Sequence, residues 1–458
     1  MNTFSKEENS SLVNPPNKKV LIITYYFPPS GGAGVQRTLR FLSNLSQFGW
    51  DPVILTTKNG DFPTKDLSLL NKVPVNTKIY RTYIPEPYRS YRRLTGRKRG
   101  EALDLSTLAV DESNSTNIAE QFATFIRTWF FIPDARIGWL PFAFFSGLKI
   151  IRQEKIDLIF SSAPPNTVHV IASALKRVTG KKWVADFRDP WMKYLVPKRN
   201  SAVPRKLDLA LNRMVVDRAD HLIWVCAGVK KEVEATTRKK FLGKETIIFN
   251  GFDEMNFENL SHRRTEKFTI TYVGTLYIRY DLTSFIEAIE KICSTRNDFK
   301  HDFELILCGP VDEQIRKKLK NSKFQKNIQF LGYLNHKATL TRMVSSTLLL
   351  LFIIDSPEGK NIPTSKLFEY IGAKRPIFAL APQDSEAAEI LNRTKSGIVV
   401  PPADIVKIQN AILDLYERWK QNDTLNLPFD AKEVQQFESK NLTRELVTIW
   451  NETSPRSD

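Results

Sequence analysis

The sequence predicts an α/β protein made of two doubly wound parallel-sheet domains that face each other across a cleft. Short and almost continuously apolar runs alternate with amphipathic helical patterns along the chain, as parallel strands buried on both faces require. This alternation stops once, in a polar stretch at residues 250–267, and then starts again. A chain of 458 residues also exceeds what one hydrophobic core usually holds.

Each expected strand is one of these apolar runs. In the first half of the chain they are KVLIITYY (19–26), PVILTT (52–57), IDLIFSS (156–162), KWVADF (182–187), HLIWVC (221–226) and TIIFN (246–250). In the second half they are FTITYVG (268–274), FELILCG (303–309), NIQFLG (327–332), TLLLLFI (347–353), PIFALA (376–381) and GIVVP (397–401). With helices between the strands, the same Rossmann-like unit is built twice.

The polar segments give the expected boundaries between these units. The first nineteen residues are polar and lack the apolar core of a signal peptide. We expect, in order, a disordered tail over residues 1–17, an N-terminal domain over 18–250, a linker over 251–267, a C-terminal domain over 268–430, and within 431–458 a helix that crosses back to the N-terminal domain before a short tail.

The formal net charge of +17 implies an anionic partner without naming it. Part of the excess lies in a basic and polar stretch at residues 89–117, which we interpret as an insertion into the N-terminal domain. Such a stretch is usually solvated, and the functional alternative is contact with an anionic membrane surface. The aromatic-rich residues 129–147 could assist docking, form an acceptor pocket or belong to the core. No regular aromatic platform accompanies the basic residues, so we expect no nucleic-acid binding.

The cysteines and the hydropathy favour a cytoplasmic protein. The three cysteines, Cys226, Cys293 and Cys308, have spacings that match neither a zinc site nor a disulfide framework. No stretch approaches the roughly 20 apolar residues that a membrane-spanning helix needs. An Asp-x-Asp motif is also missing from the sequence, so we expect no metal and no other cofactor.

Ligands of open α/β sheets bind beyond the carboxyl ends of the strands, so the loops there are the first place to look for a site. The loop after the first strand contains Gly31, Gly32 and Gly34. Glycines let backbone approach a ligand closely, and the next helix offers free N–H groups to an anion. A plain turn would need one glycine rather than three.

The loop VADFRDPW (184–191) holds two acids that flank an arginine. Asp189 could simply cap a helix that begins at Pro190. At the carboxyl end of a strand beside a cleft, however, such a group more often positions a ligand. We therefore take Asp186, Arg188 and Asp189 as candidate catalytic residues.

The loop after the first strand of the C-terminal domain can bind a phosphate. Gly274 and Thr275 offer backbone and hydroxyl groups, and Arg279 can neutralise the charge. The alternative is that Arg279 is an ordinary surface residue.

The segment NIPTSKLFEYIGAKRP (361–376) is the most informative. Pro363 suits the first position of a helix, and Ile362 before it cannot act as a cap. The first N–H groups are then left for a phosphate. Lys366 adds charge, and Glu369 lies three residues later on the same helix face, where it can accept ribose hydroxyls. An exposed Lys–Glu pair is the other interpretation.

Together these motifs resemble the family-4 type of GT-B glycosyltransferases over roughly residues 18–425. The matching segments are FPPSGGAGVQR, NGFD (250–253), YVGTL (272–276), SKLFEYIGAKRPI, SEAAEIL and GIVVPPAD. The resemblance implies the GT-B arrangement of two Rossmann-like domains. It also implies transfer of a sugar from a nucleotide-sugar donor, with retention of configuration.

The resemblance assigns roles to single residues. It makes Glu369 the ribose-binding acid and brings Lys366 to the diphosphate. Asn361 stands where the family usually has an acid that contacts the donor sugar. The full set of expected donor-binding residues is Gly31, Gly32, Gly274, Thr275, Arg279, Asn361, Thr364, Ser365, Lys366 and Glu369.

By resemblance, the acceptor is a glycan or a lipid-linked molecule and the setting is cell-envelope or exopolysaccharide biosynthesis, on the inner face of the plasma membrane. Two alternatives stay open. A GT-B nucleotide-sugar epimerase would share the architecture and the donor site. A non-catalytic nucleotide-sugar-binding protein of polysaccharide assembly would bind the donor without turnover.

Overall fold

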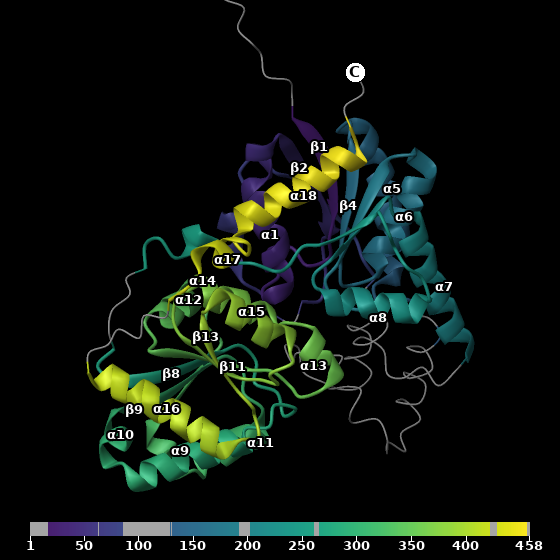
Figure 1. Ribbon diagram of the computed structural model, residues 1–458. Helices are drawn as coiled ribbons and strands as arrows, with labels where there is room; N and C mark the ends of the chain where they lie inside the picture. Colours follow the sequence, from purple (N-terminus) through teal and green to yellow (C-terminus); the bar gives the residue numbers. More distant parts are fainter. Residues whose placement is uncertain are drawn as a thin grey trace, which may run out of the picture.

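The computed structural model describes residues 17–62, 64–85, 129, 131–191, 202–260, 265–421 and 428–455. Two parallel sheets, each flanked by helices, form two domains (Figure 1). The expected fold class is therefore confirmed. The insertion expected at 89–117 and residues 261–264 of the expected linker lie outside the described residues, as does the expected tail before residue 17.

The N-terminal sheet is parallel throughout, with the strand order β3-β2-β1-β4-β5-β6-β7. Its described strands are β1 (Lys18–Ile23), β2 (Trp50–Thr57), β3 (Lys78–Thr82), β4 (Leu158–Ala163), β5 (Lys182–Phe187), β6 (His221–Trp224) and β7 (Glu245–Ile247). Strand β3 was not expected. It lies at the sheet edge with its residues exposed or half-buried, so it lacks the continuous apolar run that marks a central strand.

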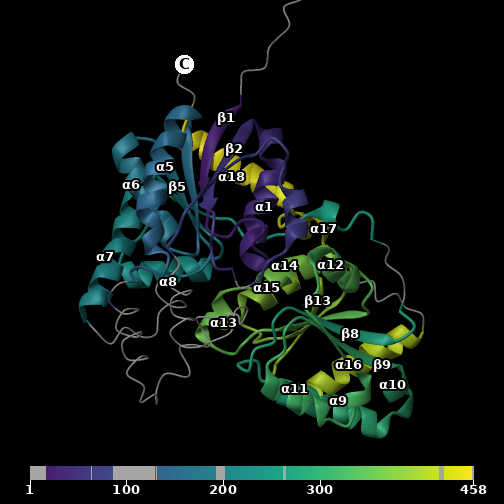
Figure 2. The same ribbon diagram turned by 180° about the vertical axis from the view of Figure 1, so that it is seen from behind.

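The helices of this domain lie on both faces of the sheet (Figures 1 and 2). They are α1 (Ala33–Leu45), α5 (Leu140–Gln153), α6 (Thr167–Thr179), α7 (Ala202–Arg218) and α8 (Ala227–Thr237), with the short 3-10 helices η1 (Ser46–Phe48), η2 (Leu67–Lys72) and η4 (Ile137–Trp139). Helix α1 follows Gly32, whose φ of +83° is a conformation that glycine adopts without strain.

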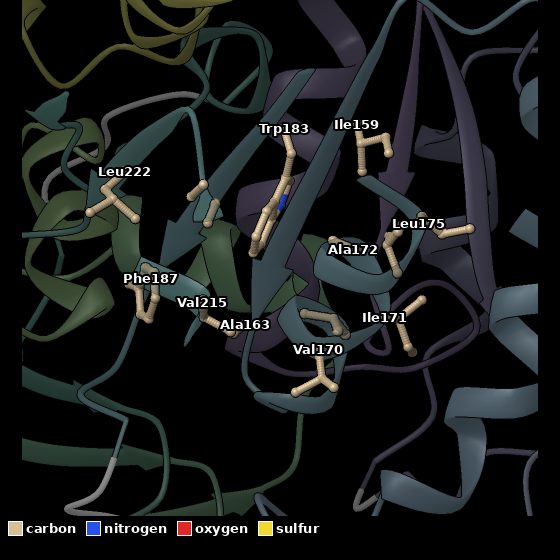
Figure 3. Packing of buried hydrophobic residues seen from close by; sticks show 14 of the residues in the cluster. Ile159, Ala163, Val170, Ile171, Ala172, Leu175, Trp183, Phe187, Val215 and Leu222 are labelled. Atoms are coloured by element: carbon tan, nitrogen blue, oxygen red, sulfur yellow. The ribbon is translucent and has the colours of Figure 1, made fainter. Parts of the chain in front are cut away.

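The core between the sheet and helices α5 and α6 is closely packed (Figure 3). Trp183 and Phe187 of β5 are completely buried there. Gly147 of α5 allows the two helices to approach, because a Cβ at that position would lie 2.7 Å from the Leu175 side chain. The close approach therefore depends on the glycine.

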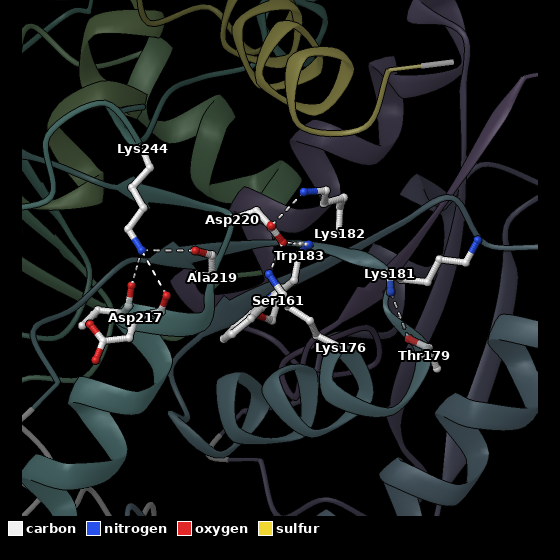
Figure 4. Close-up of polar contacts among 11 residues, drawn as sticks. Ser161, Lys176, Thr179, Lys181, Lys182, Trp183, Asp217, Ala219, Asp220 and Lys244 are labelled. Carbon is white, nitrogen blue, oxygen red and sulfur yellow. Dashed lines mark hydrogen bonds and ion pairs between the residues drawn. The ribbon is translucent and has the colours of Figure 1, made fainter. Parts of the chain in front are cut away.

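Polar side chains pair with one another at the edge where β5 begins (Figure 4). Asp220 accepts a hydrogen bond from the backbone N–H of Trp183 at 2.8 Å and forms ion pairs with Lys176 and Lys182. Lys244 donates to the carbonyl of Val216 in the last turn of α7 at 2.7 Å, which satisfies a free carbonyl of the helix end. These groups bind each other, so this edge serves the fold.

The C-terminal sheet is also parallel, with the order β10-β9-β8-β11-β12-β13. Its strands are β8 (Phe268–Val273), β9 (Phe303–Cys308), β10 (Ile328–Gly332), β11 (Leu348–Phe352), β12 (Ile377–Leu380) and β13 (Gly397–Val400). The helices are α9 (Thr283–Thr295), α10 (Asn297–Asp302), α11 (Glu313–Lys320), α12 (His336–Val344), α13 (Pro357–Asn361), α14 (Ser365–Gly372), α15 (Glu386–Thr394), α16 (Ile405–Lys420) and α17 (Ala431–Gln435), with η5 (Glu254–Asn256) and η6 (Gln325–Asn327).

The chain returns to the N-terminal domain through α18 (Ser439–Thr453), which lies beside α1 (Figure 1). The outward and return crossings are hydrogen-bonded to each other, because Phe252 donates to the Phe437 carbonyl at 3.0 Å and Ser439 donates to the Phe252 carbonyl at 2.8 Å. Trp450 of α18 is fully buried and packs against Trp50 at 5.3 Å between ring centroids. The last helix is thus part of the first domain's core.

Both sheets change the direction of their strand order at one point, between β1 and β4 and between β8 and β11. Loops at such switch points leave a crevice beyond the carboxyl ends of the strands. Within the described ranges, no helix is both long and apolar enough to cross a membrane.

Candidate functional site

A cleft with a volume of about 480 Å³ lies between the two domains, and its walls come from the loops that follow the strands. The N-terminal domain lines it with Gly32, Gln36, Arg40, Thr64 and Asp66. Eight of the ten expected donor-binding residues line it as well: Gly32, Gly274, Thr275, Arg279, Thr364, Ser365, Lys366 and Glu369. Loops from both switch points thus meet in one site.

Helix α14 forms one wall, and its start differs from our expectation. The helix begins at Ser365 rather than at Pro363. Thr364 is the N-cap, and its hydroxyl accepts a hydrogen bond from the Lys366 N–H at 3.5 Å. The expectation that Pro363 is the first helical residue is wrong, because the threonine one position after it caps the helix. One of the free N–H groups at the helix N-terminus is therefore already hydrogen-bonded within the protein.

Lys366 lies over the ring of Tyr272, with 4.3 Å between its Nζ and the ring centroid, and donates to the Tyr272 hydroxyl at 2.5 Å. The Tyr272 hydroxyl in turn donates to the carbonyl of Thr275 at 2.9 Å. Gly274 makes room for this lysine, since a Cβ there would lie 2.5 Å from its Cε. The β8 strand and the following loop thus fix the position of the ammonium group.

The charge on Lys366 is poised to change near neutral pH. Burial lowers its pKa to about 7, and the charge of Arg279 acts in the same direction, while Glu369 opposes both. Arg279 lies over the ring of Tyr277 at 5.0 Å from the centroid. Two cations held close enough to lower the pKa of one of them form a site for an anionic ligand.

Glu369 lies one turn further along α14 and is bound from the N-terminal domain. Its Oε1 pairs with Nη2 of Arg40 at 2.7 Å, and Nε2 of His336 lies 3.9 Å from the same oxygen. Burial alone would raise the pKa of Glu369, but His336, Arg40 and Lys72 outweigh it and lower the pKa below its usual value. The carboxylate is therefore ionised and able to accept hydrogen bonds.

The candidate catalytic residues do not line this cleft. Asp186 is completely buried, with Oδ1 and Oδ2 bound by Arg37 at 2.8 and 3.1 Å and Oδ2 also bound by Ser162 at 2.7 Å. This differs from the expected catalytic role, because the protein's own donors engage both oxygens. Arg188 donates to the carbonyls of Ala163, Gly34 and Pro164 and so holds the glycine loop against β4.

Asp189 is half-buried, and burial raises its pKa against the opposing charge of Arg188. A role for Asp189 stays a prediction. Gly31 lies beside the cleft, where its N–H donates to the Thr64 carbonyl at 2.9 Å. That N–H is bound within the loop, and a role for Gly31 in donor binding stays a prediction.

Asn361 does not line the cleft, and its expected contact with the donor sugar stays a prediction. Its Nδ2 donates to the Pro357 carbonyl at 2.7 Å, and its own carbonyl packs against the start of α8. A Cβ at Gly228 would lie 2.0 Å from that carbonyl oxygen. The residue ends the short helix α13, three positions before Thr364, which lines the cleft.

The cleft contains polar residues that we had not expected there, namely Arg40, Asp66, Tyr333 and His336. Arg37 and Arg40 lie three positions apart among the apolar residues of α1, and both are buried. Two arginines among apolar residues are a signal of buried partners that a sequence can show. His336 and Tyr333 have no comparable signal. In the described part of the chain, no group of three or more His, Cys, Asp or Glu side chains is arranged to hold a metal ion.

Comparisons with known proteins agree with this arrangement. Residues 267–418 match the family model described as glycosyl transferases group 1. No curated protein matches the sequence significantly. Among solved structures, a glycosyltransferase from Rickettsia africae superposes with a TM-score of 0.61 at 14% identity, over 96% of this chain and 100% of the other.

Two further structures are similar at the level of the fold. Sucrose-phosphate synthase from Thermosynechococcus elongatus has a TM-score of 0.61 at 14% identity, over 95% of this chain and 99% of its own. HepE from Anabaena, in complex with UDP and glucose, has a TM-score of 0.57 at 13% identity, over 95% and 100%. These likenesses show that the chain has the GT-B fold, and residues 267–418 match the model of the glycosyl transferases group 1.

Proposed function

We propose that this protein is a glycosyltransferase that moves a sugar from a nucleoside diphosphate sugar to a glycan or lipid-linked acceptor. The observation that carries the proposal is the pairing, in one interdomain cleft, of two cations with an ionised carboxylate one helical turn away. A nucleoside diphosphate has the matching chemistry, since its anionic diphosphate is linked to a ribose with two hydroxyls.

In this proposal the diphosphate binds Lys366, Arg279 and the start of α14, and the ribose binds Glu369. The backbone of Gly274 and Thr275 lies beside the lysine and supports the same phosphate position. HepE, which shares the fold, is also described in complex with UDP-glucose. That similarity supports the class of donor. It leaves the base and the sugar to experiment.

We propose transfer with retention of configuration and without a metal ion. The bond between the anomeric carbon and the diphosphate oxygen breaks, and the acceptor oxygen bonds to the same face of that carbon. The acceptor proton passes to the departing phosphate oxygen, whose negative charge Lys366 and Arg279 stabilise. Asp189 would then contribute by orienting sugar hydroxyls rather than by coordinating a metal.

We propose that the acceptor approaches from the N-terminal domain and that this domain docks on an anionic membrane, as cell-envelope or exopolysaccharide synthesis would require. Four residues of α5 support this proposal. Phe142, Phe145, Lys149 and Arg152 are all exposed, and their spacing of three, four and three residues places them along one stripe of the helix. Aromatic side chains beside basic ones are typical of surfaces that contact lipid headgroups.

A ligand screen followed by substitution of Glu369 tests the donor assignment. We expect one of UDP-, GDP- and ADP-sugars to raise the melting temperature. The change Glu369→Gln should then lower the affinity for that ligand by about 10- to 100-fold in calorimetry, because an ionised acceptor of ribose hydroxyls is lost. The matched control is Glu254→Gln, on an exposed acid paired with Lys374. Unchanged affinity in Glu369→Gln would contradict the assignment.

Substitution of Gly274 tests the position of the lysine. In Gly274→Ala the new Cβ would displace Lys366, so we expect nucleotide-sugar affinity to fall by about tenfold or more. Gly243→Ala is the control, because Gly243 also has positive φ, of +81°, but a Cβ there would meet no atom of the described chain within 4 Å. Equal losses of affinity in the two variants would point to backbone strain instead.

Proton uptake tests the ionisation of Lys366. With a pKa of about 7 in the empty cleft, the lysine is mostly neutral at about pH 8, and a bound diphosphate raises its pKa by restoring an opposite charge. Binding of a nucleotide sugar should therefore take up close to one proton at that pH. Calorimetry in buffers of different ionisation enthalpy measures the uptake, which should vanish in Lys366→Met. Binding without uptake in the unchanged protein would exclude this role.

Sedimentation with vesicles of phosphatidylcholine and phosphatidylglycerol tests membrane docking. Charge reversal at Lys149 and Arg152, or at Arg92, Arg93 and Arg97, should reduce the bound fraction, since each basic residue near anionic lipid contributes about 1 kcal/mol. Reversal at Lys317 and Lys318 of α11, which are exposed on the C-terminal domain, is the control. Membrane docking is wrong if all three variants sediment like the unchanged protein.

A further inference from the structure

The carboxylate of Glu369 is held by the opposite domain. Arg40 of α1 and Glu369 of α14 form an ion pair with 2.7 Å between Nη2 and Oε1, and their side chains are only 9% and 19% exposed. Both residues line the interdomain cleft. An ion pair this sheltered from solvent is geometrically specific and fixes the rotamers of both partners. The N-terminal domain therefore restricts how the C-terminal carboxylate can point.

Only one of the two carboxylate oxygens is engaged. Oε1 accepts from Arg40, and Nε2 of His336 lies 3.9 Å from it. Across the ranges that the structure describes, Oε2 has no hydrogen-bond partner, although Glu369 lines the cleft. An ionised carboxylate oxygen accepts up to two hydrogen bonds. One oxygen is thus used by the protein, and the other is left for a ligand.

A second cation of the N-terminal domain acts on Glu369 through His336. Nζ of Lys72 lies 3.1 Å from Nδ1 of His336 and donates to Asn256 at 2.8 Å. A lysine ammonium is a donor only, so Nδ1 of His336 must accept and the ring N–H is on Nε2. Nε2 is the atom nearest to Glu369. Lys72 thereby turns a hydrogen-bond donor of His336 toward the carboxylate.

Electrostatics gives the same cations a second effect. A bound diphosphate and the Glu369 carboxylate are both anionic and share one cleft, so they repel each other. Arg40 and Lys72 face Glu369 and also Asp253, and their charges offset both acids. Nucleotide binding at Lys366 is then not weakened by the ribose-binding acid.

Resting on the proposed function, in which Glu369 receives the ribose, we propose that Arg40 and Lys72 are positioning residues of the donor site. Arg40 binds Oε1 directly and Lys72 orients His336, which leaves Oε2 as the oxygen that accepts from the ribose. Discrimination of ribose from deoxyribose is therefore a property of both domains together, and it is present only when helix α1 contacts helix α14.

The experiment compares UDP with 2′-deoxy-UDP and 3′-deoxy-UDP by calorimetry, with the guanosine and adenosine sets alongside. In the unchanged protein, at least one of the two deoxy forms should bind about tenfold or more weakly than the ribonucleotide, because a hydrogen bond to a charged oxygen is lost. In Arg40→Met, binding of the ribonucleotide should weaken, and the ratio of its affinity to that of the deoxy form should fall toward one. Arg40→Lys keeps the positive charge but not the planar guanidinium group. It should therefore retain affinity for the ribonucleotide better than it retains discrimination against the deoxy form.

Lys72→Met should lower the same ratio by a smaller factor, since it acts through His336. Lys374→Met, which breaks the exposed pair with Glu254 at 3.2 Å, is the matched control and should leave the ratio unchanged. The melting temperature without nucleotide reports folding of each variant. Where Arg40→Met does not fold, Arg40→Lys alone decides, because it keeps the buried charge.

The outcomes separate this proposal from the proposed function. If the unchanged protein binds none of the nucleotides, the donor site itself is wrong. If it binds them and the folded Arg40 variants keep its ratio, Arg40 is not a positioning residue. Tighter ribonucleotide binding in Arg40→Met would also overturn the proposal, because the ion pair would then compete with the ribose.

Discussion

The buried ion pair of Arg37 and Asp186 is the contact on which the geometry of the cleft depends. Arg37 of α1 binds both oxygens of Asp186 on β5, and it also donates to the carbonyls of Ile248 and Phe249 at 2.9 and 2.7 Å. One side chain thus joins the first helix, the middle of the sheet and the start of the crossing to the second domain. A buried charge is tolerated only with this degree of pairing, and removing one partner of such a pair costs about 3–5 kcal/mol.

This contact also determines where Arg40 lies. Arg40 follows Arg37 by three residues, so it projects from nearly the same face of α1, one turn further along. Because Arg37 fixes the rotation of the helix, Arg40 is directed toward α14 and Glu369. Asp186 therefore affects the cleft from a distance. It holds the helix that carries Arg40, a residue of the cleft.

The sequence predicted the strands well because parallel strands buried on both faces have nearly continuous apolar runs. It did not reveal β3, whose edge position leaves its residues exposed or half-buried. The sequence also predicted most of the loops that line the cleft, because the carboxyl ends of parallel strands meet at one edge. Sequence alone could not show that His336, Lys72 and Arg40 would surround one carboxylate, since they come from three distant segments. The sequence also did not determine the cap at Thr364 or the place of Asn361, because both depend on the local backbone conformation.

Helix α18 has a consequence for the order in which the chain becomes structured. The first domain includes residues from both ends of the described chain, with Trp450 packed against Trp50 and Phe160. During synthesis the ribosome releases the second domain before α18 exists, so the C-terminal domain can complete its core first. The N-terminal domain must wait with an open face on α1 until the last helix emerges. Nascent chains that stop before residue 439 would leave that apolar face exposed to chaperones and proteases.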